Sequence, residues 1–140
     1  MKEFQSRCDT IEEAYEFMLA YAAQGLEGDA GSQTGGQLRE FLRRTATALT
    51  GLGDLYASTI EREGLQPASA YTAFGAVLDR DARSSLAAVE LVLAQPSISS
   101  QVIDNLNASI HLRALLTDLF LIDEILKSLE VRLKPDATTI

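Results

Sequence analysis

The side chains that could do chemistry are few in this 140-residue chain, which has one histidine, His111, and one cysteine, Cys8. Zinc fingers, iron–sulfur clusters and disulfide frameworks need more histidine and cysteine than one chain supplies here, so they are excluded. A ferritin-like di-iron site needs Glu-x-x-His pairs, but Ala108 lies three residues before the histidine. The sequence therefore predicts no metal site, no cofactor and no catalytic residue.

His111 remains a candidate for phosphoryl transfer. The chain resembles histidine phosphotransfer domains in architecture, because those are acidic four-helix bundles of similar length with one helical histidine. The resemblance implies that His111 would accept a phosphoryl group, although Ala114 stands where that family usually has lysine. Helical spacing places His111 on the same apolar stripe as Leu129, so we expect it to be packed in a core or interface.

Acidic residues are concentrated near the N-terminus, where the first 30 residues contain seven acidic and two basic side chains. Glu12, Glu13 and Glu16 fall on the polar side of the first predicted helix. They predict a face that meets a protein partner with a basic surface. Asp9, Glu12 and Glu13 disfavour a thiolate, so we expect Cys8, placed just before that helix, to be an inert thiol.

The overall composition narrows the possible partners and the compartment. The chain has 20 acidic and 12 basic residues, for a net charge of −8, which argues against binding nucleic acid or an anionic membrane. Neither a signal peptide nor an apolar run of about 20 residues is present, so no membrane span is expected. With a single cysteine, the predicted compartment is the cytoplasm.

The elements that must position these residues are all helical, because apolar residues recur every three to four positions and no alternating strand pattern is found. We predict an all-α, antiparallel four-helix bundle as a single domain over residues 1–133, with a flexible tail over 134–140. The sequence Thr10-Ile11-Glu12-Glu13 matches a capping box that would start the first helix. The predicted helices cover about 10–25, 37–63, 67–95 and 99–133, with a glycine-rich loop over 25–36.

Two glycines, Gly51 and Gly53, interrupt the second predicted helix and each costs about 1 kcal/mol relative to alanine. A kink or a close helix crossing would explain them, and so would a ligand pressed against the bare backbone. In the ligand hypothesis, Tyr56, Tyr71 and Phe74 are candidate pocket walls.

The last predicted helix is apolar over well over half of its circumference, which is more than one packed face requires. Its main stripe contains Leu115 and Leu119. The surplus residues, which we assign to a homodimer interface through this long C-terminal helix, are Leu116, Phe120, Leu121 and Ile125.

The sequence thus favours a non-enzymatic cytoplasmic accessory, adaptor or regulatory protein that acts through protein–protein contacts. The first alternative is a bundle, possibly an enzyme, that binds a small molecule or cofactor near Gly51 and Gly53. The second alternative is phosphotransfer through His111.

Overall fold

The computed structural model describes residues 1–133, and all of their regular structure is helical. The all-helical prediction is confirmed for this part of the chain. Six helices are present where four continuous ones were predicted, and the predicted tail over 134–140 lies outside the described residues. The helices are α1 (Lys2–Ala23), α2 (Gln33–Leu49), α3 (Leu52–Glu63), α4 (Ala68–Leu93), α5 (Ser100–Ala108) and α6 (Ile110–Leu133).

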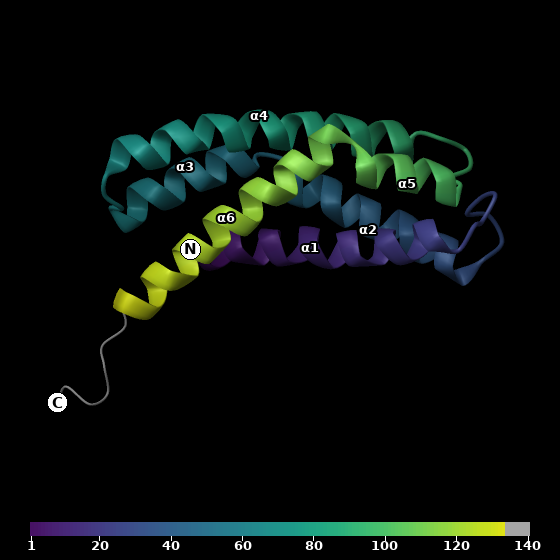
Figure 1. The fold of residues 1–140 in the computed structure, drawn as a ribbon, viewed down its shortest axis with the longest axis horizontal. Helices are drawn as coiled ribbons and strands as arrows, with labels where there is room; N and C mark the ends of the chain where they lie inside the picture. The colour runs from purple at the N-terminus through teal and green to yellow at the C-terminus, as the bar shows by residue number, and fades with distance from the viewer. Residues whose placement is uncertain (134–140) are drawn as a thin grey trace.

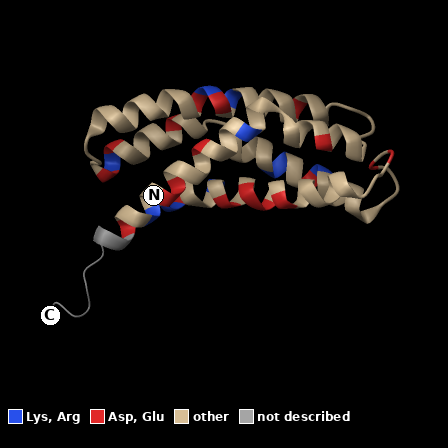
Figure 2. Ribbon diagram, viewed as in Figure 1, with Lys and Arg blue, Asp and Glu red and all other residues tan. Residues whose placement is uncertain are grey.

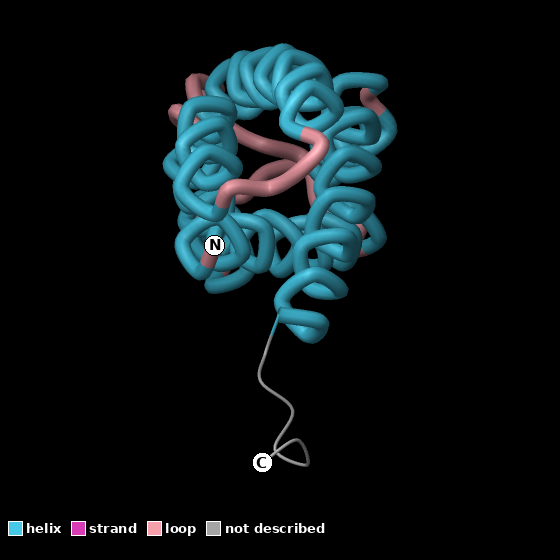
Figure 3. Tube along the Cα trace, turned by 90° about the vertical axis from the view of Figure 1, so that its left-hand side faces the viewer, coloured by secondary structure: helices cyan, strands magenta, loops and turns pink. Residues whose placement is uncertain are grey.

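The helices surround a shared apolar core (Figures 1 and 3). α1 packs mainly against α2 and α5, while α4 packs against α3, α2 and α6. α6 crosses diagonally from α4 toward the N-terminal end of α1 (Figure 1). Within residues 1–133, no helix combines the length and apolarity needed to cross a membrane.

α1 begins eight residues earlier than predicted. Phe4 and Cys8 are fully buried and extend the apolar stripe of Ile11 back by two turns, so burial continues the helix to Lys2. Thr10 lies inside this helix, where its hydroxyl donates to the carbonyl oxygen of Ser6 at 3.0 Å. The predicted capping box is therefore wrong, and the thiol lies within a helix rather than before one.

The predicted helix over 37–63 is divided at Gly51, which has a left-handed backbone with φ of +69°. Glycine adopts this conformation at no steric cost, so the chain turns here between α2 and α3. The start of α2 was also misplaced. Ser32 caps it by accepting a hydrogen bond from the Gly35 amide at 2.9 Å, so the predicted loop over 25–36 ends at residue 32.

The predicted helix over 99–133 is divided at Ser109, whose backbone is extended with φ of −61° and ψ of 142°. Its hydroxyl accepts a hydrogen bond from the Leu112 amide at 3.3 Å, and its carbonyl accepts one from the Arg113 amide at 3.1 Å. Ser109 therefore caps α6, and the extended backbone at this residue lets α6 run in a different direction from α5.

Candidate functional site

An apolar groove of about 300 Å³ lies between the N-terminal part of α4, Tyr56 of α3 and the middle of α6. Its lining is almost entirely apolar. The structure thereby brings together three aromatic residues, Tyr56, Tyr71 and Phe74, that the sequence suggested as pocket walls. The complete lining, called the α4–α6 groove below, is Tyr56, Pro67, Ala70, Tyr71, Phe74, Leu121, Ile122 and Ile125.

Tyr56 is held in the wall of the groove by a close approach between α3 and α4. A side chain at Gly75 would meet the Tyr56 ring at 2.9 Å, so the bare backbone there makes room for the ring. The Tyr56 hydroxyl donates to the carbonyl oxygen of Tyr71 at 2.7 Å, and its ring meets Phe74 edge-on at 6.4 Å. Burial raises the pKa of Tyr56 to about 12, so the phenol stays neutral as a donor.

Neither Gly51 nor Gly53 lines the groove, which corrects the placement of the ligand hypothesis. Gly51 is exposed at the turn between α2 and α3, with open space where a side chain would be. Gly53 is buried against α4, where a Cβ would overlap the Asp79 side chain. The close-crossing explanation therefore accounts for Gly53, and the turn accounts for Gly51.

The surplus apolar residues of α6 divide into three groups. Leu121 is 53% exposed and Ile125 is 38% exposed, and both line the α4–α6 groove. Phe120 is 54% exposed but lies outside the groove lining. Leu116 is only 4% exposed and belongs to the core, so its assignment to an exposed interface is corrected. The predicted ligand walls and the predicted interface thus meet at one surface.

The N-terminal glutamates lie on α1, along which acidic residues are frequent (Figure 2). Glu13 and Glu16 are exposed, whereas Glu12 is partly buried. Burial, and then the nearby Asp123 carboxylate, raise the pKa of Glu12. Asp123 is itself buried and is paired with Lys127 at 2.9 Å. The exposed part of the predicted acidic face is therefore Glu13 and Glu16.

His111 is exposed in the first turn of α6, so it does not pack into the core of this chain, and its place in an interface stays a prediction. Its backbone carbonyl accepts a hydrogen bond from the Ser85 hydroxyl at 2.9 Å, which anchors the start of α6 to α4. Cys8 is fully buried, and burial and then the charge of Asp123 raise the pKa of its thiol. This environment is that of an unreactive thiol.

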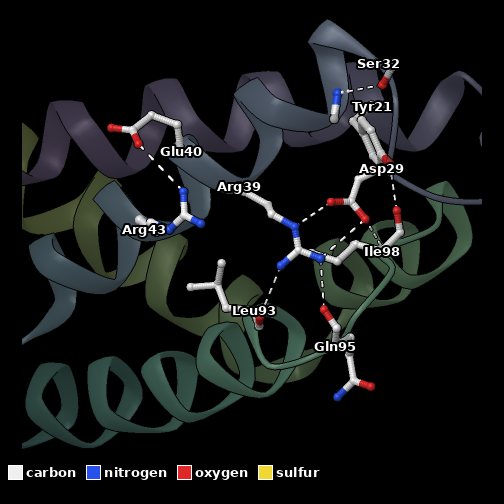
Figure 4. Close-up of polar contacts among 10 residues, drawn as sticks. Tyr21, Asp29, Ser32, Arg39, Glu40, Arg43, Leu93, Gln95 and Ile98 are labelled. Carbon is white, nitrogen blue, oxygen red and sulfur yellow. Dashed lines mark hydrogen bonds and ion pairs between the residues drawn. The ribbon is translucent and has the colours of Figure 1, made fainter.

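A buried polar clamp at the opposite end of the molecule was missed from the sequence (Figure 4). Asp29 accepts hydrogen bonds from the Arg39 guanidinium and from the Ile98 amide, the latter at 2.6 Å. Arg39 also donates to the carbonyl oxygens of Leu93 at 3.2 Å and Gln95 at 2.9 Å. The Asp29–Arg39 clamp therefore ties the glycine-rich loop, α2 and the α4–α5 connection together. The hydrogen bond from Arg39 lowers the pKa of Asp29.

A second missed feature is a pair of carboxyl groups, Asp81 on α4 and Asp118 on α6. Their side chains are close enough to share a hydrogen bond, and Asp118 is 9% exposed. Burial, and then the contact with Asp81, raise the pKa of Asp118 to about 7. The neighbouring Asp79 and Arg83 instead form a surface ion pair, at 2.9 Å.

A hollow between α1 and α2 is lined by Arg7, Arg43 and Arg44. Arg7 donates to the carbonyl oxygen of Thr50 at 2.7 Å, and Glu40 lies 3.2 Å from Arg44 and 4.0 Å from Arg43. These guanidinium groups thus already have oxygen partners within the protein.

Among residues 1–133, no three histidine, cysteine, aspartate or glutamate side chains come together in a way that could hold a metal ion. Comparison with protein-family models, with curated proteins and with solved structures finds no match to this chain.

Proposed function

We propose that this protein is a non-enzymatic cytoplasmic accessory or adaptor module that acts through protein–protein contacts made by the α4–α6 groove. The observation that carries the proposal is that exposed Leu121 and Ile125 border an apolar hollow with aromatic walls. Water contact with such a surface is unfavourable, at about 25 cal/mol for each Å² of apolar area. Grooves of this kind are typical sites for apolar side chains of a partner.

The occupant that we propose is a second copy of the chain, in a homodimer through α6. A two-fold interface must offer both a hollow and a protruding side chain within one surface. α6 offers both, because Leu121 is half exposed on the rim of the groove and Ile122 lies within its lining. In this proposal the six helices together form a four-helix bundle, and α6 of each copy lies at the two-fold axis.

Self-association can be measured by light scattering over a concentration series of the full chain. We expect a dimer whose dissociation constant rises at least about tenfold in Leu121→Gln, because one buried leucine contributes about 1.5–3 kcal/mol. The matched control is Leu91→Gln, since Leu91 is 66% exposed on α4 but outside the groove lining. A monomer at every concentration, or equal effects of the two variants, would contradict the homodimer.

Glu13 and Glu16 supply the proposed contact with a basic partner, because both are exposed on α1. The adaptor proposal is tested by comparing proteins captured from native extract by the wild type, by Leu121→Gln and by Glu13→Lys/Glu16→Lys. A stoichiometric partner that is lost with either variant and kept with Leu91→Gln supports it. A partner that binds all four baits equally counts against both surfaces.

Binding of a small apolar molecule in the same groove is the second candidate function. The convergence of Tyr56, Tyr71 and Phe74 favours it, although about 300 Å³ is at the lower end for ligand pockets. Ala70→Phe should fill the hollow from its rim, since Ala70 is an exposed lining residue. Saturable one-to-one binding of an aromatic fluorescent probe to a monomer, abolished by Ala70→Phe, would favour this function over the homodimer.

Phosphotransfer through His111 stays the weakest candidate. Its exposure gives a phosphodonor access, but the lysine expected at the position of Ala114 is missing. Incubation with acetyl phosphate would test it, with a phosphohistidine absent from His111→Gln as the supporting result.

A further inference from the structure

The contact between α4 and α6 has three successive parts. The Ser85 hydroxyl donates to the His111 carbonyl at one end, and Phe74 and Leu121 both line the α4–α6 groove at the other. The Asp81–Asp118 pair lies between these two parts in both helices. Residue numbers fall along α4 as they rise along α6, so the two helices are antiparallel here. The carboxyl pair therefore lies next to the groove along the same contact between α4 and α6.

Asp118 of the pair is buried, and the Asp81 side chain is 16% exposed. One carboxylate oxygen of Asp118, Oδ2, is buried and receives no hydrogen bond from a donor in the described residues. The nearest cation is Arg80, whose exposed guanidinium lies 3.8 Å from Asp81. Among the described groups, only Asp81 and Arg80 of α4 exert a charge effect on Asp118.

The other helices that pack on α6 add no opposing charge to the pair. Asp9 and Glu12 of α1 instead act on Lys127, which lies farther along α6. α5 carries one acidic residue, Asp104, which is exposed. Two ionised carboxylates in contact would therefore repel each other in a poorly solvated place, and one proton between them removes that repulsion.

We propose that Asp81 and Asp118 form a proton-dependent latch between α4 and α6. With one proton, the two carboxyl groups share a hydrogen bond and hold the helices together beside the groove. When that proton leaves to solvent, two carboxylates face each other and this part of α6 moves away from α4. The latch does not require the groove to bind a partner, so its failure and the failure of the proposed contact function are separable.

The sign of the effect follows from the raised pKa of Asp118. The protonated pair stabilises the folded chain fully below the ordinary aspartate pKa of about 3.8, and this contribution is lost as the pH rises to about 7. Above that pH the pair stays ionised and the separation of the helices is complete. The latch is therefore closed in mild acid and open in mild alkali.

The test is a carboxyl-carbon NMR titration of the full chain, with the methyl groups of Leu121, Ile122 and Ile125 followed in parallel. We expect one aspartate to titrate near pH 7 and the methyl signals to shift with the same midpoint. Asp118→Asn should abolish both titrations, whereas Asp104→Asn, on an exposed surface of α5, should leave them unchanged.

Several results would overturn the latch. The first is a wild-type titration in which all aspartates titrate below about pH 5, as ordinary carboxyl groups do. The second is a methyl shift that persists in Asp118→Asn or, if that variant does not fold, in Asp81→Asn. Loss of the titration near pH 7 on addition of calcium chloride would identify the pair as a cation site instead.

Discussion

Two regions of the molecule hold their helices together by opposite means. At the end with the glycine-rich loop, the Asp29 carboxylate is neutralised by Arg39 and bonded to the Ile98 amide. On the α4–α6 side, the Asp118 carboxylate faces the like charge of Asp81, and the groove next to it is apolar and open. The pKa of Asp29 is lowered, whereas that of Asp118 is raised. The comparison indicates a rigid end that fixes the fold, and a side whose apolar groove is exposed.

The largest test of this contrast is Arg39→Ala at the rigid end. The substitution leaves Asp29 buried without its cation and removes donors to the Leu93 and Gln95 carbonyls. We expect a loss of about 3–5 kcal/mol in the free energy of unfolding, measured with urea. Arg43→Ala, one turn further along α2, breaks only an exposed pair and should cost at most about 1 kcal/mol. Equal losses would show that the clamp is no stronger than a surface ion pair.

Gly75→Ala tests the groove side with a smaller expected effect. The added methyl group would press on the Tyr56 ring, which must shift and strain its hydrogen bond to the Tyr71 carbonyl. Overpacking of this kind costs about 1–3 kcal/mol. Chemical denaturation gives the size, and near-ultraviolet circular dichroism reports the displaced tyrosine. An unchanged tyrosine signal would mean that the groove wall does not depend on Gly75.

The aromatic walls could be anticipated from the sequence because they follow helical stripes, and a stripe is local information. Tyr71 and Phe74 are one turn apart on α4, so any α4 that buries one of them brings the other nearby. The break at Ser109 could not be anticipated, because Ala108-Ser109-Ile110 contains neither glycine nor proline. Only the tertiary packing of α5 against α1 and of α6 against α4 divides that segment.

The clamp was missed for a different physical reason. Five glycines between residues 25 and 36 indicate conformational freedom, and Arg39 follows a polar pattern typical of an exposed helix face. Their roles depend on carbonyl groups at Leu93 and Gln95, more than 50 residues away. The same applies to Asp118, whose partner Asp81 lies on another helix. Short-range patterns carry no information about such pairs.

Acid denaturation gives a further test of the comparison. The free energy of unfolding changes by an amount on the order of 1 kcal/mol for each pH unit by which folding lowers the pKa of Asp29. A lowered pKa gives stability that is present above the ordinary aspartate value and is lost as the pH falls through the folded-state value. We expect Asp29→Asn to flatten the acid limb of the curve of unfolding free energy against pH. An acid limb of unchanged slope would assign acid sensitivity to other carboxylates.

The smallest expected effect is at Gly36, next to a glycine that the clamp end requires. A side chain at Gly35 would overlap the Asp29 carbonyl, whereas one at Gly36 meets nothing within 4 Å. Gly36→Ala should therefore stabilise α2 by about 0.4–1 kcal/mol. Thermal unfolding would show a raised midpoint, and Gly35→Ala should show a lowered one. A loss of stability in Gly36→Ala would contradict the packing described for this end.

The clamp also decides where the chain tolerates insertions. A glycine-rich connection is the usual choice for an epitope tag or a circular permutation, because lengthening it is expected to change little. Here Asp29 accepts from the Ile98 amide, and the Leu26 amide donates to the Ser100 hydroxyl at 2.8 Å. Both bonds join the connection over 24–32 to the connection that leads from α4 into α5. A tag inserted over 24–32 would therefore separate the two connections. The segment with the most permissive composition is thus among the least permissive to engineering.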